Sequence, residues 1–263
     1  MLNEIPPEAG FGVTLDDAVA TITLNRPERL NAQTPHTWVW LRRFGADLPG
    51  TVRVVIVRGA GRAFSAGLDR GMFSVDGVEG TPGLLALAAA PPADAMSTIA
   101  GYQEAFGWLA RTDLVSVAAV QGHAIGAGFQ LALACDIRIA TEDAQFTMAE
   151  TSLGLVPDLG GTKRLVELVG YSRAADICLT GRRVPAAEAL RIGLAAQVVS
   201  PDDLGDAVEA TVNALLGSPR DAAVETKALL LAASGRTQAE QEAAEREAQY
   251  RRLRDLAQFV DER

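Results

Sequence analysis

Apolar residues in the N-terminal part of the chain follow the patterns of β-strands. Residues 12–15 and 18–25 flank Asp16-Asp17, and the second segment alternates apolar and polar side chains. This arrangement predicts a β-hairpin with a two-residue turn at the two aspartates. Residues 52–59, VRVVIVRG, form the kind of continuous apolar run that packs as a buried strand. We therefore expect this region to contribute adjacent strands to a sheet.

Two segments place apolar residues at the spacing of an amphipathic helix instead. They are residues 35–48, where Trp38 and Leu41 begin the apolar stripe, and residues 94–110. The stretch between 74 and 93 is rich in Gly, Pro and Ala. Such a composition predicts a mobile loop. The wider variable segment, residues 71–100, is expected to shape the pocket for the acyl chain.

A strand, a glycine-rich loop and a helix follow one another again in the middle of the chain. The pattern predicts a strand at 114–120, a loop at 121–127 and a helix from about 127 to 134. Further strands are expected around 135–140 and 144–148. This recurrence favours an α/β fold built as a repeating coil of ββα units.

The chain becomes helical after residue 170, and a boundary is expected near residue 200. Ser200 has the residue type and position of a helix N-cap, and Thr237 with Glu240 has the spacing of a capping box. We divide the chain into a sheet-bearing core, residues 1–199, and a helical region, residues 200–263. Helices this polar on one face need a partner surface, so the second region is expected to mediate self-association.

The charge balance argues against nucleic acid as a partner. The chain has 24 Lys and Arg against 33 Asp and Glu, a net charge of −9, and no basic cluster offsets it. The longest nearly uncharged stretch, residues 80–101, is interrupted by prolines and an aspartate. We therefore expect no membrane span.

The cysteines and the N-terminus predict a cytoplasmic protein. Cys135 and Cys178 lie far apart without a CxxC motif, as expected of thiols in a reducing compartment. The first residues have neither the basic nor the apolar segment of a secretion signal.

Two glycine-rich loops are candidates for binding a developing negative charge. Ala66-Gly67-Leu68 follows the strand at 52–59, and Gly126-Ala127-Gly128 precedes the helix at about 127–134. If successive repeats stack, backbone amides after these turns point into one cleft and form an oxyanion hole. The alternative interpretation is two tight turns without chemistry.

Two carboxylates follow the second loop. Glu150 and Asp158 lie eight residues apart, in polar and glycine-containing surroundings. Either residue alone is more typical of a loop or a helix cap. Together, downstream of a candidate anion site, they suggest enolate chemistry in which a carboxylate moves a proton. Gln130, at the start of the intervening helix, is usually only polar lining.

Other chemistries fit the sequence poorly. Ser65 lacks the G-x-S-x-G elbow of a serine hydrolase, and the chain has only His36 and His123. The histidines and cysteines form no metal-ligand cluster, and no P-loop motif is present. The turn at 121–128 is similar to that of short-chain dehydrogenases, but none of the tyrosines has a lysine four residues later.

The chain resembles the crotonase superfamily, the enoyl-CoA hydratases and isomerases. The similarity rests on FSAGLD (64–69), QGHAIGAGFQLALACDIRIA (121–140) and ETSLGLVPDLGGTKRL (150–165). NRPERLNA (25–32) and TGRRVPAAEALRIGL (180–194) extend it over most of the chain. The resemblance implies a crotonase-like spiral of ββα repeats with a helical C-terminal region, assembled as a homotrimer or a dimer of trimers. It also implies an acyl-CoA thioester substrate, with no metal and no redox cofactor.

Site residues follow from the same resemblance, position by position. The backbone N–H groups of Leu68 and Ala127 match the two oxyanion-hole donors, and Glu150 and Asp158 match catalytic carboxylates. The positions that match substrate or CoA contacts are Arg26, Arg29, Ala66, Gly67, Asp69, Gly126 and Gln130.

Three departures from the family pattern bear on the reaction. Hydratases of this family resemble one another in having Glu at two positions, and this chain has Gln130 and Glu150 there. Asp158 matches a position where dienoyl-CoA isomerases place a catalytic Asp. Glu262 occupies the place of a C-terminal Lys that is often found near the CoA phosphates. We therefore expect double-bond isomerisation, with hydration as the alternative and a non-catalytic acyl-CoA binder as a more remote one.

Overall fold

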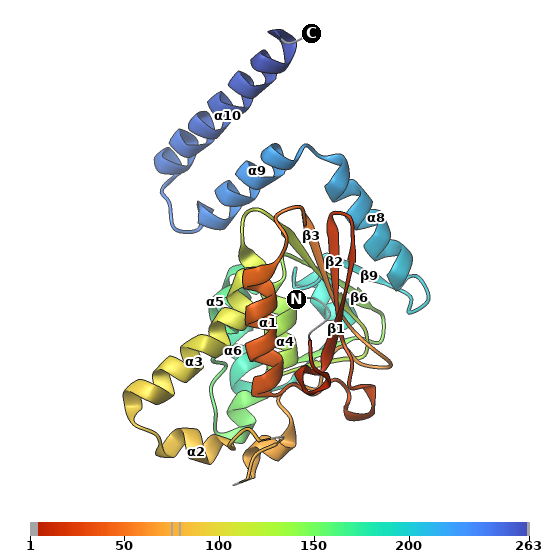
Figure 1. The fold of residues 1–263 in the computed structure, drawn as a ribbon, viewed down its shortest axis with the longest axis vertical. Coiled ribbons are helices and arrows are strands. Elements are labelled where there is room, and N and C mark those ends of the chain that lie inside the picture. Colours follow the sequence, from red (N-terminus) through yellow and green to blue (C-terminus); the bar gives the residue numbers. More distant parts are fainter. Residues whose placement is uncertain (1–4, 75, 79, 262–263) are drawn as a thin grey trace.

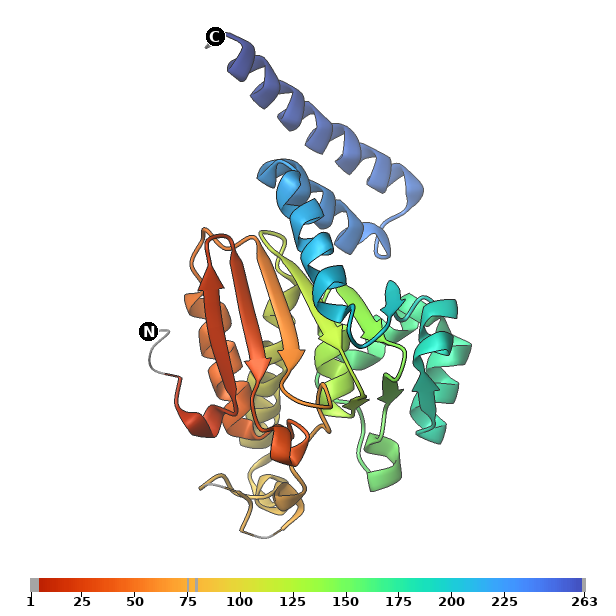
Figure 2. The same cartoon turned by 90° about the vertical axis from the view of Figure 1, so that its right-hand side faces the viewer.

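The computed structural model describes residues 5–74, 76–78 and 80–261 (Figures 1 and 2). It has one large and one small sheet, with the large sheet in the order β1-β2-β3-β4-β6-β9. β1 and β2 are antiparallel, and every later neighbour pair in this sheet is parallel. The strands of the large sheet are β1 (Phe11–Asp16), β2 (Val19–Leu24), β3 (Val54–Gly59), β4 (Val115–Val120), β6 (Ile137–Thr141) and β9 (Gln197–Val199).

The predicted N-terminal hairpin is confirmed, but its turn lies one residue later than expected. Asp16 still pairs with Val19 across the ladder, so the turn consists of Asp17 and Ala18. Asp17 has a φ of 47°, in the left-handed region. Aspartate tolerates this conformation better than most residues, which explains why the turn forms there.

The small sheet corrects the expectation of a plain loop at 121–127. It contains β5 (His123–Ile125), β7 (Gln145–Thr147) and β8 (Arg183–Pro185), in that order. A strand of three residues is too short to show an alternating pattern. Each of β4 and β6 is thus followed by a short second strand, and isolated bridges from Ser65 to Ala124 and from Gln33 to Leu68 continue the small layer. These pairings build the spiral of ββα repeats.

Helices cover both faces of the large sheet because alternate residues of each strand face opposite ways. Val54, Val117 and Ile139 pack with Val208 and Val212 of α8 (Leu204–Gly217) on one face. Their neighbours in the same strands belong to the main core, on the opposite face. The helices that precede α8 in the chain are α1 (Pro35–Asp47), α2 (Leu84–Ala89), α3 (Pro92–Gly107), α4 (Ala127–Ala134), α5 (Gly161–Val169), α6 (Tyr171–Thr180) and α7 (Ala186–Arg191).

The predicted helices near 35–48 and 94–110 are confirmed as α1 and α3, the second ending in a 3₁₀ turn at Trp108–Ala110. The predicted loop at 74–93 is only partly a loop, because α2 lies within it. Leucines and alanines give α2 its helical preference, while the surrounding Gly and Pro residues keep it short.

The last helices extend away from the sheet, as both views show (Figures 1 and 2). α9 (Arg220–Ala233) is followed by α10 (Gln238–Asp261), which packs on α9. The capping box of Thr237 and Glu240 opens α10 as predicted. Ser200 is not an N-cap: α8 begins four residues later, and Ser200 instead bonds Asp203 in the preceding turn. Among the described residues, no helix is long and apolar enough to cross a membrane.

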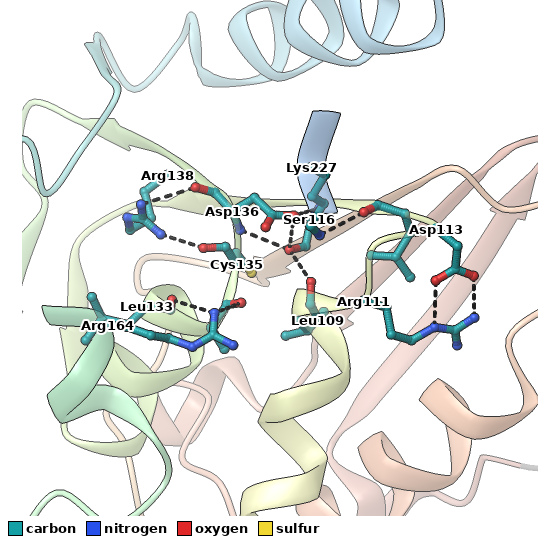
Figure 3. Close-up of polar contacts among 12 residues, drawn as sticks. Leu109, Arg111, Asp113, Ser116, Leu133, Cys135, Asp136, Arg138, Arg164 and Lys227 are labelled. Atoms are coloured by element: carbon teal, nitrogen blue, oxygen red, sulfur yellow. Dashed lines mark hydrogen bonds and ion pairs between the residues drawn. The ribbon is translucent and has the colours of Figure 1, made fainter. Parts of the chain in front are cut away.

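A buried ion pair fixes α9 to the core (Figure 3). Lys227 Nζ lies 2.7 Å from Asp136 Oδ2 and donates to the Leu114 carbonyl at 2.8 Å. The same Asp136 oxygen accepts from the backbone N–H and the hydroxyl of Ser116. These acceptors lie at the starts of β4 and β6. Lys227 therefore anchors α9 to two central strands of the large sheet.

Candidate active site

The two glycine-rich segments predicted to form an anion site are in direct contact. Gly67 has a φ of 84°, and a Cβ placed there would collide with the Ile125 carbonyl oxygen. The same Cβ would lie 3.3 Å from the Ala127 nitrogen. Only glycine allows the two backbones to approach this closely. Gly67 therefore brings the Leu68 segment beside the first residue of α4.

In the described part of the chain, Leu68 and Ala127 each present a backbone N–H that has no protein acceptor. The residues flanking Leu68 bond Gln33, through Gly67 O at 2.7 Å and Asp69 N at 2.8 Å. In such a parallel bridge the N–H of the middle residue points the other way. Ala127 is the first residue of α4, where N–H groups lack intrahelical partners. Within the described part of the chain, neither N–H donates a hydrogen bond to a protein acceptor.

A buried polar network that the sequence did not reveal supports the Leu68 segment. Ser65 Oγ accepts from Gly67 N at 3.2 Å and from Gln33 Nε2 at 3.1 Å, and it donates to the Asn31 carbonyl at 2.8 Å. Gln33 Oε1 in turn accepts from the indole N–H of Trp38 at 2.8 Å. Ser65 is thus a support for the loop backbone. The only sequence signal was a set of polar residues among apolar ones, which does not identify their partners.

Glu150 and Gln130 form the centre of the site. Glu150 opens a 3₁₀ turn after β7 and is only 9% exposed, and its Oε1 accepts from Gln130 Nε2 at 2.7 Å. The other oxygen, Oε2, is buried without a hydrogen-bond partner in the structure. A Cβ at Gly126 would lie 3.3 Å from Glu150 Oε1, so the carboxylate faces the turn that begins α4.

The orientation of the Gln130 amide is fixed by backbone groups. Its Oε1 accepts from Leu159 N at 2.9 Å and from Gly161 N at 3.3 Å. These groups can only donate, so the amide oxygen faces them and the NH₂ faces Glu150. Gln130 is 1% exposed. It therefore joins Glu150 to the segment that contains Asp158.

Asp158 lies near Glu150 but is less buried. Burial raises the pKa of the Asp158 carboxyl above its usual range. Burial also raises the pKa of Glu150, and the nearby Asp158 carboxyl raises it further, although the N–H of Gln130 opposes this rise. Among the residues described, neither carboxylate is in an ion pair with a cation. The structure thus brings the two predicted carboxylates together without neutralising them.

Asp69, Arg26 and Arg29 form an ion cluster beside Leu68. Asp69 Oδ2 lies 3.1 Å from Arg26 Nη2 and 3.1 Å from Arg29 Nη1, and Oδ1 accepts from Gly71 N. Burial raises the pKa of Asp69, but the Gly71 amide and the two arginines outweigh this effect and hold the pKa below its usual value. Arg26 also donates to the Ala32 carbonyl at 3.0 Å.

These contacts separate the predicted CoA-binding residues into two kinds. Arg26 and Asp69 are engaged within the protein, and Asp69 is only 4% exposed. The side chain of Arg29 is 55% exposed and remains accessible to a ligand. Ala66 is half-buried at the edge of the Leu68 segment. Glu262, at the expected position of a phosphate-binding lysine, lies outside the described residues.

The described residues contain no cluster of three or more His, Cys, Asp or Glu side chains that could hold a metal ion. The site instead combines free backbone donors with two carboxylates of raised pKa. Such donors suit a developing oxyanion, and such carboxylates suit proton transfer near neutral pH.

A ββα spiral with a helical C-terminal region, whose turns meet in this way, is the crotonase fold. A Thermobifida fusca protein classed as an enoyl-CoA hydratase, solved with acetoacetyl-CoA, matches it with a TM-score of 0.92 and 51% identity. That match covers 96% of this chain and 98% of the other. The chain belongs to the enoyl-CoA hydratase/isomerase family, whose model matches residues 14–257.

Relatives within the family differ in the reactions for which they are named. The chain is 35% identical over 205 residues to the probable enoyl-CoA hydratase echA8 of Mycobacterium bovis, covering 77% of this chain and 74% of that protein. It is 35% identical over 207 residues to 1,2-epoxyphenylacetyl-CoA isomerase of Escherichia coli, covering 78% and 75%. The family is thus established, and the reaction has to be argued from the site.

Proposed function

We propose that this enzyme isomerises a carbon–carbon double bond in an acyl-CoA thioester through an enolate. The observation that carries the proposal is the hydrogen bond from the Gln130 amide to Glu150. The amide occupies the place where a second carboxylate would be needed to activate water, and an amide cannot act as a base.

The oxyanion would form between the two free backbone donors. In this mechanism the N–H groups of Leu68 and Ala127 donate hydrogen bonds to the thioester oxygen, and Gly67 and Gly126 provide the close backbone approach. Losing one such donor costs about 3–4 kcal/mol of transition-state stabilisation in enzymes that use an oxyanion hole. The positive end of the α4 dipole adds to this stabilisation at Ala127.

Glu150 is the proposed base. Its Oε1 is occupied by Gln130, so Oε2 is the oxygen that would take a proton from the substrate. Its raised pKa makes it a stronger base than an exposed carboxylate and brings it closer to the neutral range, where general bases are efficient. Glu150 alone could return the proton to a neighbouring carbon. Asp158 would accept or return it further along the chain, which permits a longer shift of the double bond.

Binding of the CoA portion is proposed for the surface around Ala66 and Arg29. Arg29 is accessible and cationic, which suits the CoA phosphates, while Arg26 and Asp69 hold the loop in shape. The T. fusca structures with acetoacetyl-CoA and with CoA support an acyl-CoA ligand for this fold. The proposed chemistry uses no metal and no redox cofactor.

Assembly as a homotrimer or a dimer of trimers in the cytoplasm completes the proposal. Tyr250, Leu253 and Leu256 of α10 are all more than half exposed, and so is Leu230 of α9. Apolar side chains of this number on isolated helices need a partner surface. We propose that residues 200–263 mediate this assembly. The first helix of this region, α8, also covers one face of the large sheet.

The alternative function is hydration of an enoyl-CoA, supported by the name of the M. bovis relative. A panel of enoyl- and dienoyl-CoA thioesters, incubated in deuterated water and followed by mass spectrometry, separates the two. Isomerisation predicts deuterium at the shifted carbon without added water. Rapid formation of a product heavier by one water would overturn the proposal and establish hydration.

Gln130→Glu tests the observation that carries the proposal. A carboxylate there would face Glu150 Oε1 and accept from Leu159 N and Gly161 N, recreating a pair that can hold water. We expect hydration to appear in this variant while isomerisation falls. Gln197→Glu, the same change at an exposed position of β9, is the matched control. Absence of any hydration in Gln130→Glu would contradict the role assigned to the amide.

A further inference from the structure

Helix α3 packs against Trp38, which belongs to the polar network that supports the Leu68 segment. The Tyr102 ring lies against the Trp38 ring, with centroids 4.9 Å apart, and the Phe106 ring lies 6.2 Å from Trp38 on its edge. Trp38 donates its indole N–H to the Gln33 side chain. The Gln33 backbone in turn bonds Gly67 and Asp69, the residues on either side of Leu68. A shift of α3 would therefore also move the Leu68 segment, because ring packing and hydrogen bonds connect the two.

The next residue of α3 contacts the other half of the site. Gln103 Nε2 donates to the backbone carbonyl of Asp158 at 2.7 Å. Gln103 is exposed, so hydrophobic packing does not require an amide at this place. The bond spans 55 residues of sequence and joins α3 to the segment that precedes α5.

The backbone around Asp158 is held by two amides from different helices. Gln103 binds the Asp158 carbonyl from α3, while Gln130 binds Leu159 N and Gly161 N from α4. Among the described residues, no side chain forms a hydrogen bond with the Asp158 carboxyl. Backbone tethers therefore set where this carboxyl lies, and Gln103 supplies the tether at Asp158 itself.

We propose that Gln103 is a positioning residue that holds the Asp158 carboxyl at the correct distance from Glu150 through the Asp158 carbonyl. The proposal rests on the proposed isomerase function. Through the adjacent residues Tyr102 and Gln103, α3 sets the relative position of the oxyanion loop and of the second carboxylate.

Gln103→Met tests the proposal by comparing two reactions of one enzyme. Exchange of the α-protons of butyryl-CoA with deuterium requires Glu150 and the oxyanion hole only, whereas isomerisation of a 3,5-dienoyl-CoA also requires Asp158. Misplacing a catalytic group by about 1 Å costs up to ~10²-fold in rate. We expect kcat for the dienoyl-CoA to fall by about 10-fold to ~10²-fold. KM and the rate of α-proton exchange should stay near the wild-type values.

Gln103→Glu is the second variant, because it keeps the length of the side chain but cannot donate to a carbonyl. It should show the same split between the two reactions. Glu104→Gln, which alters the neighbouring surface pair with Arg42, is the control and should change neither rate. Wild-type rates in both Gln103 variants would overturn the inference, and so would equal losses in both reactions. A wild-type enzyme that neither exchanges nor isomerises would refute the proposed function instead.

Discussion

Two acidic regions lie near the point where the Leu68 segment meets α4, and they are built in opposite ways. Asp69 is buried against Arg26 and Arg29, and these cations and the Gly71 amide hold its pKa below the usual range. Glu150 is buried against a neutral amide, and Asp158 adds a like charge instead of an opposite one. One region stabilises the charge of its carboxylate, and the other destabilises it.

The difference identifies which carboxylates can exchange protons. A carboxylate paired with two guanidinium groups stays ionised at neutral pH and serves as structure. A carboxylate that is desolvated and near another acid has its pKa moved toward neutrality, where it can both take and return a proton. Substitutions in the Asp69 region and in the Glu150 region should therefore differ in their effects on activity and on stability.

Removing the proposed base should have the largest effect. Glu150→Gln keeps the shape of the side chain and a partner for Gln130, but it has no basic oxygen. General acid–base catalysis is typically worth ~10²–10⁴-fold. We expect kcat to fall by at least about 10²-fold while acyl-CoA binding, measured by calorimetry, is retained. If the variant kept the wild-type kcat, Glu150 would have a structural role like that of Asp69 and would not be the base.

Removing the second carboxylate should have a smaller and more selective effect. Asp158→Asn is expected to lower the rate of a long double-bond shift by about 10²-fold, since one acid–base group is lost. A shift between neighbouring carbons should change less, because Glu150 alone can carry it. Steady-state rates on 2-enoyl- and 3,5-dienoyl-CoA substrates measure the difference. Equal losses on both substrates would contradict the separate role of Asp158.

Breaking the ion cluster should affect stability more than chemistry. Asp69→Asn removes the carboxylate that bonds Arg26 and Arg29, and a hydrogen bond to a charged group is worth about 1.5–3 kcal/mol. Urea unfolding at fixed protein concentration should show this loss of stability. The rate per folded molecule should fall much less than in Glu150→Gln. A loss of 10²-fold or more in kcat without a loss of stability would reverse the assignment.

The smallest effect is a difference in the sign of pH dependence. The folded-state pKa of Asp69 is lowered, so its stabilisation is present above its ordinary value of 3.8 and is lost as pH falls through the folded pKa. The folded-state pKa of Glu150 is raised, so stability is lost as pH rises from its ordinary value of 4.5 through the folded pKa.

Unfolding curves at a series of pH values should therefore separate the two regions. Asp69→Asn should cost more stability at neutral pH than at low pH. Glu150→Gln should become more stable relative to the wild type as pH rises above 4.5. The same sign for both variants would contradict the contrast between the regions.

Local pattern was enough to predict most elements of the fold. The N-terminal hairpin, the strand at 52–59 and the helix at 35–48 all appear, because the alternation of apolar and polar residues reflects the face that each element buries. The pattern failed for β5, which has three residues, and for α2, which lies in a segment rich in Gly and Pro. Elements this short contain fewer than two periods of the pattern that would identify them.

The sequence also determined the candidate chemistry. Gly67 and Gly126 mark turns with positive φ, and Glu150 and Asp158 stand close in the chain, so short-range pattern and family resemblance were enough to propose them. Only the tertiary structure decided their partners. Asp69 and Arg29 are 40 residues apart, Gln103 and Asp158 are 55 apart, and Lys227 and Asp136 are 91 apart. Which of these side chains meet depends on how strands pair and helices dock over such distances, and no local periodicity records it.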